Sequence, residues 1–278
     1  MNYLKRLAAI GVTCSAIPAA MADAREQRNI EQVFKVGNSP VLTVKNIWGN
    51  VRVVSGANGV IKLEAREIRV ADDDDDLAYS KEVLPLRIEQ DGDEVRVIVG
   101  RQFDDWEERR QCHGCRAEYQ FLLTVPAKTA LNIRAINDGV IDIQSVSGVI
   151  NAKNVNGPIA VSELSACDEI DSVNGDVTLS MNRGLATACY VKTINGDISI
   201  TMSEPHDMEL AVSQRNGRMY TDFPLTSMAI GQQVSTDTSR KKTRYRISQD
   251  AGFRLGRGGQ RMTISSLNGD FTIQEGRK

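Results

Sequence analysis

Apolar and polar residues alternate along nearly the whole chain, in short runs rich in Val, Ile and Thr. This period of two predicts β-strands, because successive side chains of a strand point to opposite faces. Gly, Asn or Asp bounds most runs, as expected at turns. Helical periodicity is hard to find beyond the first residues. The runs include VLTVKNI, VRVVSG, VIKLEAREIRV, EVRVIVG, EYQFLLTV, LNIRAI and VIDIQSV.

One motif recurs within this pattern: an apolar residue, Asn-Gly, Asp, and then an alternating run. It reads SVNGDVTLS from Ser172, TINGDISIT from Thr193 and SLNGDFTIQ from Ser266. Glycines recur at regular steps of 9, 18 or 21 residues, at positions 139, 148, 157, 175, 196 and 217. A near-constant step indicates an internal repeat.

Two architectures fit the repeat. Asn-Gly between strands is typical of antiparallel hairpins, which would give a meander. It also suits the corners of a parallel coil, where Asn tolerates and Gly prefers positive φ. The regular period favours the second. We therefore expect an all-β fold, a parallel β-solenoid or β-helix-like single domain with a sandwich-like or capped N-terminal part.

The parallel arrangement predicts a core. Each coil would stack on the last at about 4.8 Å, with its apolar residues pointing inward. The residues expected to stack are Val173, Val177 and Leu179 near Ile194, Ile198 and Ile200, with Val155 and Ile159 in the coil before. Residues 28–60 and 222–278 are the candidates for covering the open ends of the stack.

The first 22 residues have the features of a secretory signal peptide. Lys5 and Arg6 precede an apolar run, and Ala20-Met21-Ala22 is a small-x-small end, which predicts cleavage after Ala22. The run is too short for a membrane span, and no transmembrane segment is expected elsewhere. Removing two of the 34 basic residues leaves 32 against 36 acidic, a net charge of −4. This balance does not favour a nucleic-acid partner.

Four of the five cysteines remain after cleavage: Cys112, Cys115, Cys167 and Cys189. An even number in an exported chain favours two disulfides. Cys167 and Cys189 precede Gly175 and Gly196 by eight and seven residues, so they occupy nearly equivalent places on successive coils. We expect them to pair, with a bulge absorbing the one-residue offset. Two free thiols or mixed pairing with the other cysteines are the alternatives.

Several segments in order resemble the bacterial domain-of-unknown-function family called "putative adhesin". They are LTVKNIWGNVRVVSG (42–56), LLTVPAKTALNIRAINDGVIDI (122–143), VNGDVTLS, TINGDISIT, MYTDFPL (219–225) and LGRGGQRMTISSLNGDFTIQ (255–274). The resemblance implies a β-solenoid-like domain over residues 28–278, an extracytoplasmic role and no known catalytic residues. Residues 101–117 depart from the family pattern and look like an inserted loop.

That loop carries Cys112-His113-Gly114-Cys115. A CxxC motif serves structural disulfides, zinc sites and redox dithiols. We favour the structural disulfide, because no second half of a metal ligand set and no thioredoxin-like pattern is evident. The sequence therefore predicts neither cofactor nor metal. A thiol or metal sensor remains an alternative.

Charged and aromatic residues provide the candidate contact surfaces. The run Asp72 to Asp76 is expected to be a solvated loop or an outward-facing strand. The proposed binding residues are Trp106 and His113 in the inserted loop, and Arg240, Lys241, Lys242 and Arg244 in a basic cluster.

Asp176, Asp197 and Asp270 follow Asn-Gly. We expect them to be turn aspartates bonded to backbone amides. In a groove with a cation, Asp176 and Asp197 could instead serve a polysaccharide-active enzyme.

The function expected is non-catalytic: a structural or binding module of the cell envelope, adhesin-like, in the periplasm or secreted to the cell surface. It would contact an envelope or surface protein or a glycan. The polysaccharide-active enzyme and the thiol or metal sensor are the alternatives.

Overall fold

The computed structural model describes residues 24–100, 112–228, 234–237, 243–247 and 251–276, without the side chains of 229–250. This part of the chain is all-β, as expected, and is arranged in two mixed sheets with one helix, α1 (Asp74–Val83). The signal peptide expected at residues 1–22 lies outside the described residues. No helix among the described residues is long and apolar enough to cross a membrane.

Each sheet is a long row of hydrogen-bonded strands. In order across the first sheet, the strands are β1 (Ala24–Lys35), β4 (Val60–Ala71), β7 (Arg116–Pro126), β3 (Val51–Gly56), β9 (Ile141–Gln144), β11 (Ile159–Ser162), β13 (Val177–Met181), β15 (Ile198–Met202), β23 (Phe271–Glu275), β17 (Met219–Thr221), β20 (Thr243–Ile247) and β19 (Val234–Asp237). In order across the second sheet, they are β18 (Thr226–Met228), β21 (Ala251–Leu255), β16 (Met208–Asn216), β22 (Arg261–Asn268), β14 (Cys189–Asn195), β12 (Cys167–Asn174), β10 (Ile150–Asn156), β8 (Ala130–Asn137), β2 (Val41–Lys45), β6 (Glu94–Val99) and β5 (Leu86–Asp91).

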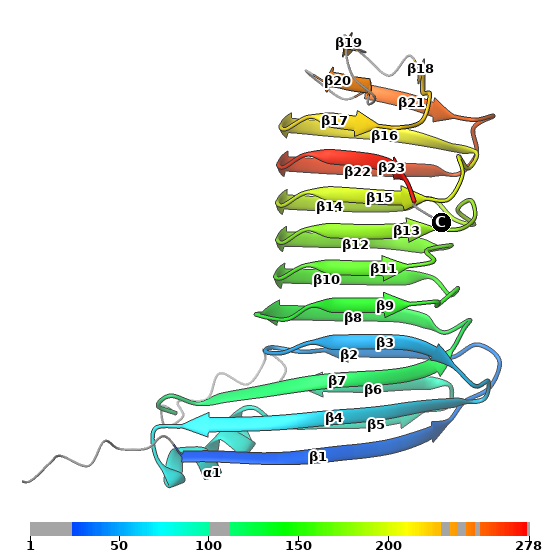
Figure 1. Ribbon diagram of the computed structural model, residues 1–278. Coiled ribbons are helices and arrows are strands. Elements are labelled where there is room, and N and C mark those ends of the chain that lie inside the picture. The colour runs from blue at the N-terminus through cyan, green and yellow to red at the C-terminus, as the bar shows by residue number, and fades with distance from the viewer. Residues whose placement is uncertain (1–23, 101–111, 229–233, 238–242, 248–250, 277–278) are drawn as a thin grey trace, which may run out of the picture.

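The repeat forms a stack of strand pairs. A strand of the second sheet runs to a corner, usually Asn-Gly, and the next strand lies in the first sheet; we call such a pair a rung. Rungs stack in parallel: Val177 and Leu179 lie opposite Ile198 and Ile200 (Figure 1). The Asn-Gly sites therefore join the two strands of one rung in a parallel stack, as the sequence predicts, and are not hairpin turns.

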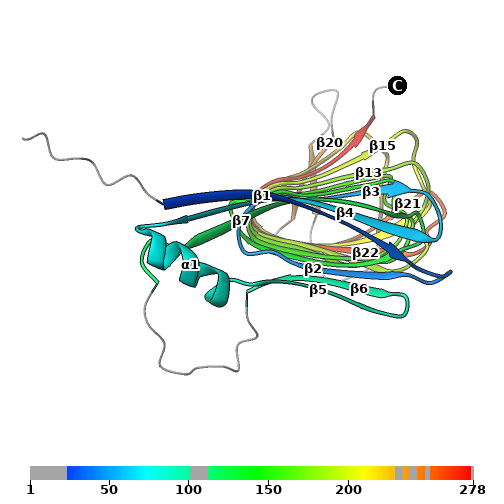
Figure 2. The same ribbon diagram turned by 90° about the horizontal axis from the view of Figure 1, so that it is seen from below.

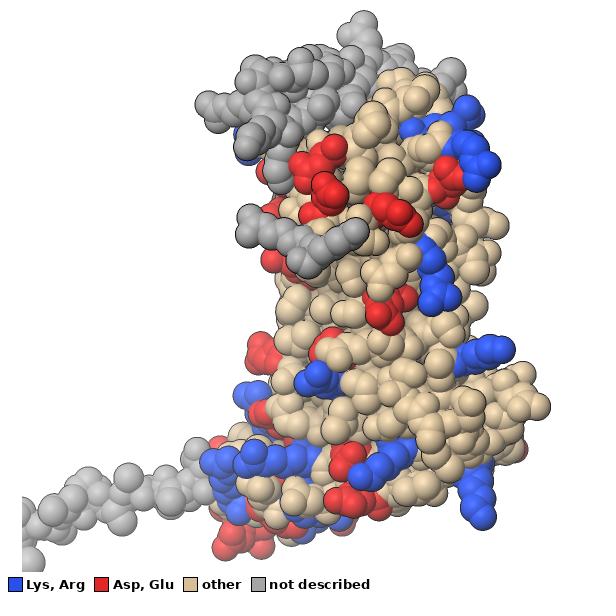
Figure 3. Space-filling model, turned by 45° about the vertical axis from the view of Figure 1, so that its right-hand side comes forward, with Lys and Arg blue, Asp and Glu red and all other residues tan. Residues whose placement is uncertain are grey.

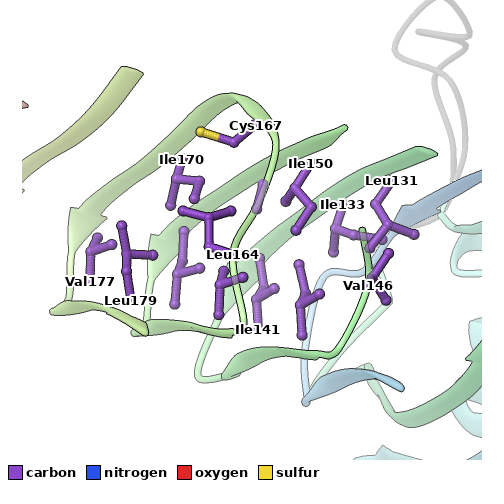
Figure 4. Packing of buried hydrophobic residues seen from close by; sticks show 14 of the residues in the cluster. Leu131, Ile133, Ile141, Val146, Ile150, Leu164, Cys167, Ile170, Val177 and Leu179 are labelled. Atoms are coloured by element: carbon purple, nitrogen blue, oxygen red, sulfur yellow. The ribbon is translucent and has the colours of Figure 1, made fainter. Parts of the chain in front are cut away.

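The core lies between the two sheets. Inward apolar residues of both strands of each rung are buried, and Figure 4 shows them in successive layers, with Ile150 lying between Ile133 and Ile170. Val177, Leu179, Ile198, Ile200 and Ile159 are buried, as expected.

The apolar residue directly before Asn-Gly does not point inward. Val155 is 40% exposed, and Val173 and Ile194 are partly exposed. The prediction that these three join the core is wrong. The residue before each of them is buried and polar, and donates a hydrogen bond to the corner carbonyl of the adjacent rung: Asn154 to Gly139, Ser172 to Gly157 and Thr193 to Gly175. The corner has a buried carbonyl to satisfy, so a polar side chain takes the inward position.

The rungs do not stack in chain order. Rung β22–β23 lies between rungs β14–β15 and β16–β17, and each of its strands pairs in parallel with both neighbours (Figure 1). Residues 261–275 were expected to belong to a cap and instead form an interior rung. Antiparallel strands end the stack, β20 and β21 at one end and β4, β1 and β5 at the other. Residues 41–56, also expected in a cap, form the first rung.

The helix is absent from the sequence prediction. The aspartate run was expected to be a solvated loop or strand, but Asp73 caps α1 by accepting from the N–H of Asp76, and Asp74 to Asp76 form the first turn. Carboxylates are favourable there because the first turn leaves unpaired N–H groups and a positive dipole end. The helix packs near β4 and β1, outside the stack (Figure 2).

A buried charge cluster holds the helix in place. Glu67, 1% exposed, accepts hydrogen bonds from Tyr119, Arg69 and Arg28. Arg69 also donates to the carbonyls of Ser80 and Leu84 at the C-terminal end of α1, each at 2.8 Å. Burial raises the pKa of Glu67, but the three donors outweigh it, and the pKa lies below its usual value.

Candidate functional site

The corner residues are engaged with one another. The carboxylate of Asp176 accepts from the N–H of Asp197 at 2.8 Å, and that of Asp197 accepts from the N–H of Asp270 at 2.7 Å. Asp176 and Asp197 are both exposed. This is the turn-aspartate arrangement expected from the sequence, with the accepted N–H on the adjacent rung. An acid–base pair would need a groove and a cation between the carboxylates, and these carboxylates lie at exposed corners.

The corner asparagines form a continuous ladder. From the second member on, each side-chain amide donates to the side-chain oxygen of the preceding asparagine, at 2.8 to 3.2 Å. In spatial order the members are Asn137, Asn156, Asn174, Asn195, Asn268 and Asn216. Donors and acceptors used in this way are not free to recognise a ligand, so the motif that dominates the sequence stabilises the stack.

The corner glycines permit close approach. A Cβ at Gly175 would lie 2.2 Å from the carbonyl oxygen of Gly157, and one at Gly157 would lie 2.1 Å from that of Gly139. Neither residue has positive φ. Positive φ, the reason for glycine expected from the sequence, therefore does not apply at these corners, and the adjacent rung is the reason instead.

The four cysteines lie in two pairs at disulfide distance, with the expected partners. Cα atoms are 5.6 Å apart in Cys112–Cys115 and 5.1 Å apart in Cys167–Cys189. Strand β12 has a register shift: Ile150 lies opposite Cys167, and the next residue, Asn151, lies opposite Glu169. The bulge predicted from the one-residue offset is therefore present.

The CHGC segment docks on the start of α1. His113 donates its backbone N–H to the Asp76 carboxylate and places Nδ1 3.2 Å from the same oxygen. Its side chain is 60% exposed. Among the described residues, no three His, Cys, Asp or Glu side chains are grouped to hold a metal ion.

The other predicted contact residues cannot be placed. Trp106, Arg240, Lys241 and Lys242 lie outside the described residues. Arg244 lies in β20, but its side chain is also outside the description.

A polar groove of about 350 Å³ lies on the outward face of the second sheet. It is formed by strands β5, β6, β2 and β8, where the β5–β6 hairpin extends beyond the stack (Figure 2). Its lining residues are Thr43, Lys45, Arg87, Glu89, Glu94, Arg96, Ile98, Asn132 and Arg134. Outward positions alternate with core residues such as Leu42, Val44 and Ile133, so the strand period fixes these side chains on one face.

The groove contains more positive than negative charge. Arg96 donates to Glu94 at 2.7 and 2.6 Å, and these bonds hold the pKa of the Glu94 carboxyl below its usual value. Lys45 and Arg134 lie opposite each other on neighbouring strands, and neither has an ion pair within the described part of the chain. Such like-charged neighbours repel, which favours an anionic ligand.

Two groups in the groove lack hydrogen-bond partners. Nε of Arg87 and Oδ1 of Asn132 are buried, and neither has a partner among the described residues. A buried polar atom without a partner costs roughly 1–3 kcal/mol, so a polar ligand that completes these contacts would gain affinity.

Sequence reasoning missed the groove. The sequence feature that could have revealed it is a shared pattern in three short segments, Thr43-Val44-Lys45, Asn132-Ile133-Arg134 and Asn151-Ala152-Lys153. Each has a neutral polar residue, an inward apolar residue and an outward base. Their alignment across strands becomes visible only when the rungs are stacked.

Charges are unevenly distributed over the surface. In the view of Figure 3, acidic and basic side chains crowd the end of the molecule where β1 lies, and the middle of that face is largely uncharged.

Comparisons with known proteins yield structural likeness alone. No family model matches the chain, and no curated protein matches it in sequence. One similar solved structure is described as a "putative cell adhesion protein" from Clostridium sporogenes, with 8% identity over 90% of this chain and 100% of that one, at a TM-score of 0.44. Another is a "putative adhesin" from Bacteroides fragilis, with 13% identity, 89% and 97% coverage and a TM-score of 0.35. A third is a "putative lipid binding protein" from Parabacteroides distasonis, with 10% identity, 91% and 97% coverage and a TM-score of 0.31.

Proposed function

We propose that this protein is an exported, non-catalytic binding module of the cell envelope, with a solenoid-like stack as its scaffold. Its groove on the outward face of β5, β6, β2 and β8 contacts an envelope component. The observation that carries the proposal is the pair of outward cations, Lys45 and Arg134, beside the unsatisfied atoms of Arg87 and Asn132.

Export is supported by two independent features. The first 22 residues have the pattern of a signal peptide. The two cysteine pairs at disulfide distance fit an oxidising compartment.

A non-catalytic role is supported by how the candidate acids are used. Asp176 and Asp197 each accept a backbone N–H from the adjacent rung at an exposed corner. No specific observation favours the polysaccharide-active enzyme or the thiol or metal sensor, and we do not propose them.

Capture from native envelope extract tests the proposal. Protein with Lys45→Glu and Arg134→Glu is compared with the unmodified protein. We expect a specific envelope component to be captured by the unmodified protein and lost from the variant. The matched control, Arg183→Glu with Arg215→Glu, makes the same charge change at exposed positions away from the groove and should leave capture intact. Equal capture by all three proteins would contradict the role of the groove.

A further inference from the structure

Two parallel rows of side chains cross the outward face of the second sheet at the groove. The base row contains Lys45, Arg134 and Lys153, which lie opposite one another on β2, β8 and β10. Two residues earlier on the same strands, Thr43, Asn132 and Asn151 form a neutral polar row in the same register. Both rows point to the same face, because side chains two apart on a strand do so.

The base row continues toward the edge of the sheet. On β6 the position opposite Lys45 is Ile98, and on β5 the position opposite Ile98 is Arg87. The row from Arg87 to Lys153 therefore crosses β5, β6, β2, β8 and β10. At about 4.8 Å per strand its length is about 19 Å.

Acidic residues end both rows on β12. Asp171 lies opposite Lys153, and Glu169 lies opposite Asn151. Glu169 also forms an ion pair with Lys153. Beyond this strand the face would repel an anion, so the favourable length for an anionic ligand ends at β10.

The neutral row contains hydrogen-bond acceptors that have no partner among the described residues. Oδ1 of Asn132 and Oδ1 of Asn151 are both buried and without a partner in the described part of the chain. The two rows are separated by two residues of strand, about 6.6 Å. A ligand lying across the strands would thus meet cations along one side and amide or hydroxyl groups along the other.

We propose that this surface binds a linear acidic polysaccharide that lies across the strands. Its carboxylates pair with Arg87, Lys45, Arg134 and Lys153, and its hydroxyl groups bond to Thr43, Asn132 and Asn151. An extended chain of uronic acid rings presents one carboxylate per ring, at a repeat close to the strand spacing. The inference rests on the proposed function and names the ligand class of the same groove.

The surface fits a polysaccharide better than a lipid membrane. Ile98 is the apolar side chain in the groove lining, whereas a membrane-binding surface presents several apolar side chains for burial among the lipids.

Oligogalacturonides of defined length provide the test, with the disulfide-bonded chain lacking residues 1–22. We expect affinity to rise with length up to about five rings, one for each strand that the base row crosses, and then to level off. Binding should weaken as salt is added, because the cations are partly exposed. Neutral dextran should not bind. Affinity that is independent of length, or equal binding of dextran, would overturn the inference.

Variants separate the two rows. Lys45→Gln with Arg134→Gln should weaken binding at least about tenfold and reduce its salt dependence. Lys45→Arg should retain binding, and Arg183→Gln with Arg215→Gln should stay within about twofold of the unmodified protein. Asn132→Ala with Asn151→Ala should weaken binding without changing the salt dependence. Unchanged affinity in the groove variants would refute the site.

Further probes distinguish other sources of negative charge. Tighter binding to phosphatidylglycerol vesicles, or to inorganic phosphate, than to the oligogalacturonides would contradict the polysaccharide assignment. If envelope capture depends on the groove but no oligogalacturonide binds, the ligand class is wrong and the proposed function stands. If neither is observed, both are wrong.

Discussion

Glycine at the corners is required by the carbonyl of the adjacent rung. Gly175→Ala would place a Cβ 2.2 Å from the Gly157 oxygen, and the contact can be relieved only by moving backbone. We expect the free energy of unfolding to fall by about 1–3 kcal/mol, the usual cost of overpacking. Urea denaturation followed by circular dichroism measures the change.

Gly184→Ala is the matched control. A Cβ there has its nearest neighbour at 3.8 Å, an ordinary contact, and φ is not in the left-handed region. It should leave stability nearly unchanged. Equal loss in both variants would mean that the corner contact is not the cause.

Glu67 should give the protein a stability component that depends on pH. Its folded-state pKa lies below its usual value, so the component is fully present above about 4.5 and is lost as pH falls through the folded pKa. Glu67→Gln leaves Arg69 buried without its charged partner, which typically costs about 3–5 kcal/mol. We expect that cost at pH 7 and a smaller difference near pH 3, measured by urea denaturation at both values.

Glu31→Gln, an exposed change on β1, controls for the loss of one charge. A difference between Glu67→Gln and the unmodified protein that is the same at both pH values would contradict the assignment.

Individual residues differ in how far the sequence predicts them. Alternation correctly places Val177, Leu179, Ile198 and Ile200 in the core. It fails one position before the corner, at Val173 and Ile194, because hydropathy does not reveal the buried Gly carbonyl that Ser172 and Thr193 satisfy.

Among the elements, the bridge between β12 and β14 offers a direct comparison of two cysteine pairs. Cys167 and Cys189 are 22 residues apart, whereas Cys112 and Cys115 are three apart. Cross-linking stabilises mainly by restricting the unfolded chain, and more so for longer loops.

Cys167→Ala with Cys189→Ala should therefore lower the free energy of unfolding by about 2–4 kcal/mol. Cys112→Ala with Cys115→Ala should cost less. Urea denaturation of both variants without reductant measures this. A larger loss from the second variant would contradict the assignment of the first pair as the main cross-link.

Strands and their pairing were largely predictable, and α1 was not. The parallel register and the bulge follow from the period and the cysteine offset. The helix was not predicted because five aspartates surround its start, and such a run is typical of a solvated segment. Asp73 nevertheless has the residue type of an N-cap. Likewise, the groove combines side chains from four strands, and no single strand contains its pattern.

For the whole molecule, the interior position of rung β22–β23 makes a clear prediction. Ending the chain after Gly259 removes the parallel partner of β16 and of β17, and one of the two parallel partners of β14 and of β15. We expect residues 203–228 to become sensitive to proteases while residues 24–100 and 112–202 stay resistant. Limited proteolysis with mass spectrometry measures this. A truncated protein that resists cleavage throughout would show that the two separated rungs can pair directly.

The order of the rungs was beyond sequence reasoning for a physical reason. Rungs β14–β15 and β22–β23 present the same features to their neighbours, an Asn-Gly-Asp corner and alternating apolar residues. Each is compatible with several partners, so local pattern predicts that rungs stack but not which ones meet.

This order also constrains how the protein can be made. During synthesis the N-terminal end of the chain emerges first, so the early rungs can form as they appear. The position between β14 and β16 stays unfilled until residues 261–275 have been synthesised. Completion is therefore delayed until nearly all of the strands have been synthesised. If the protein is exported unfolded, in line with the function we propose, this last step of folding takes place after transport.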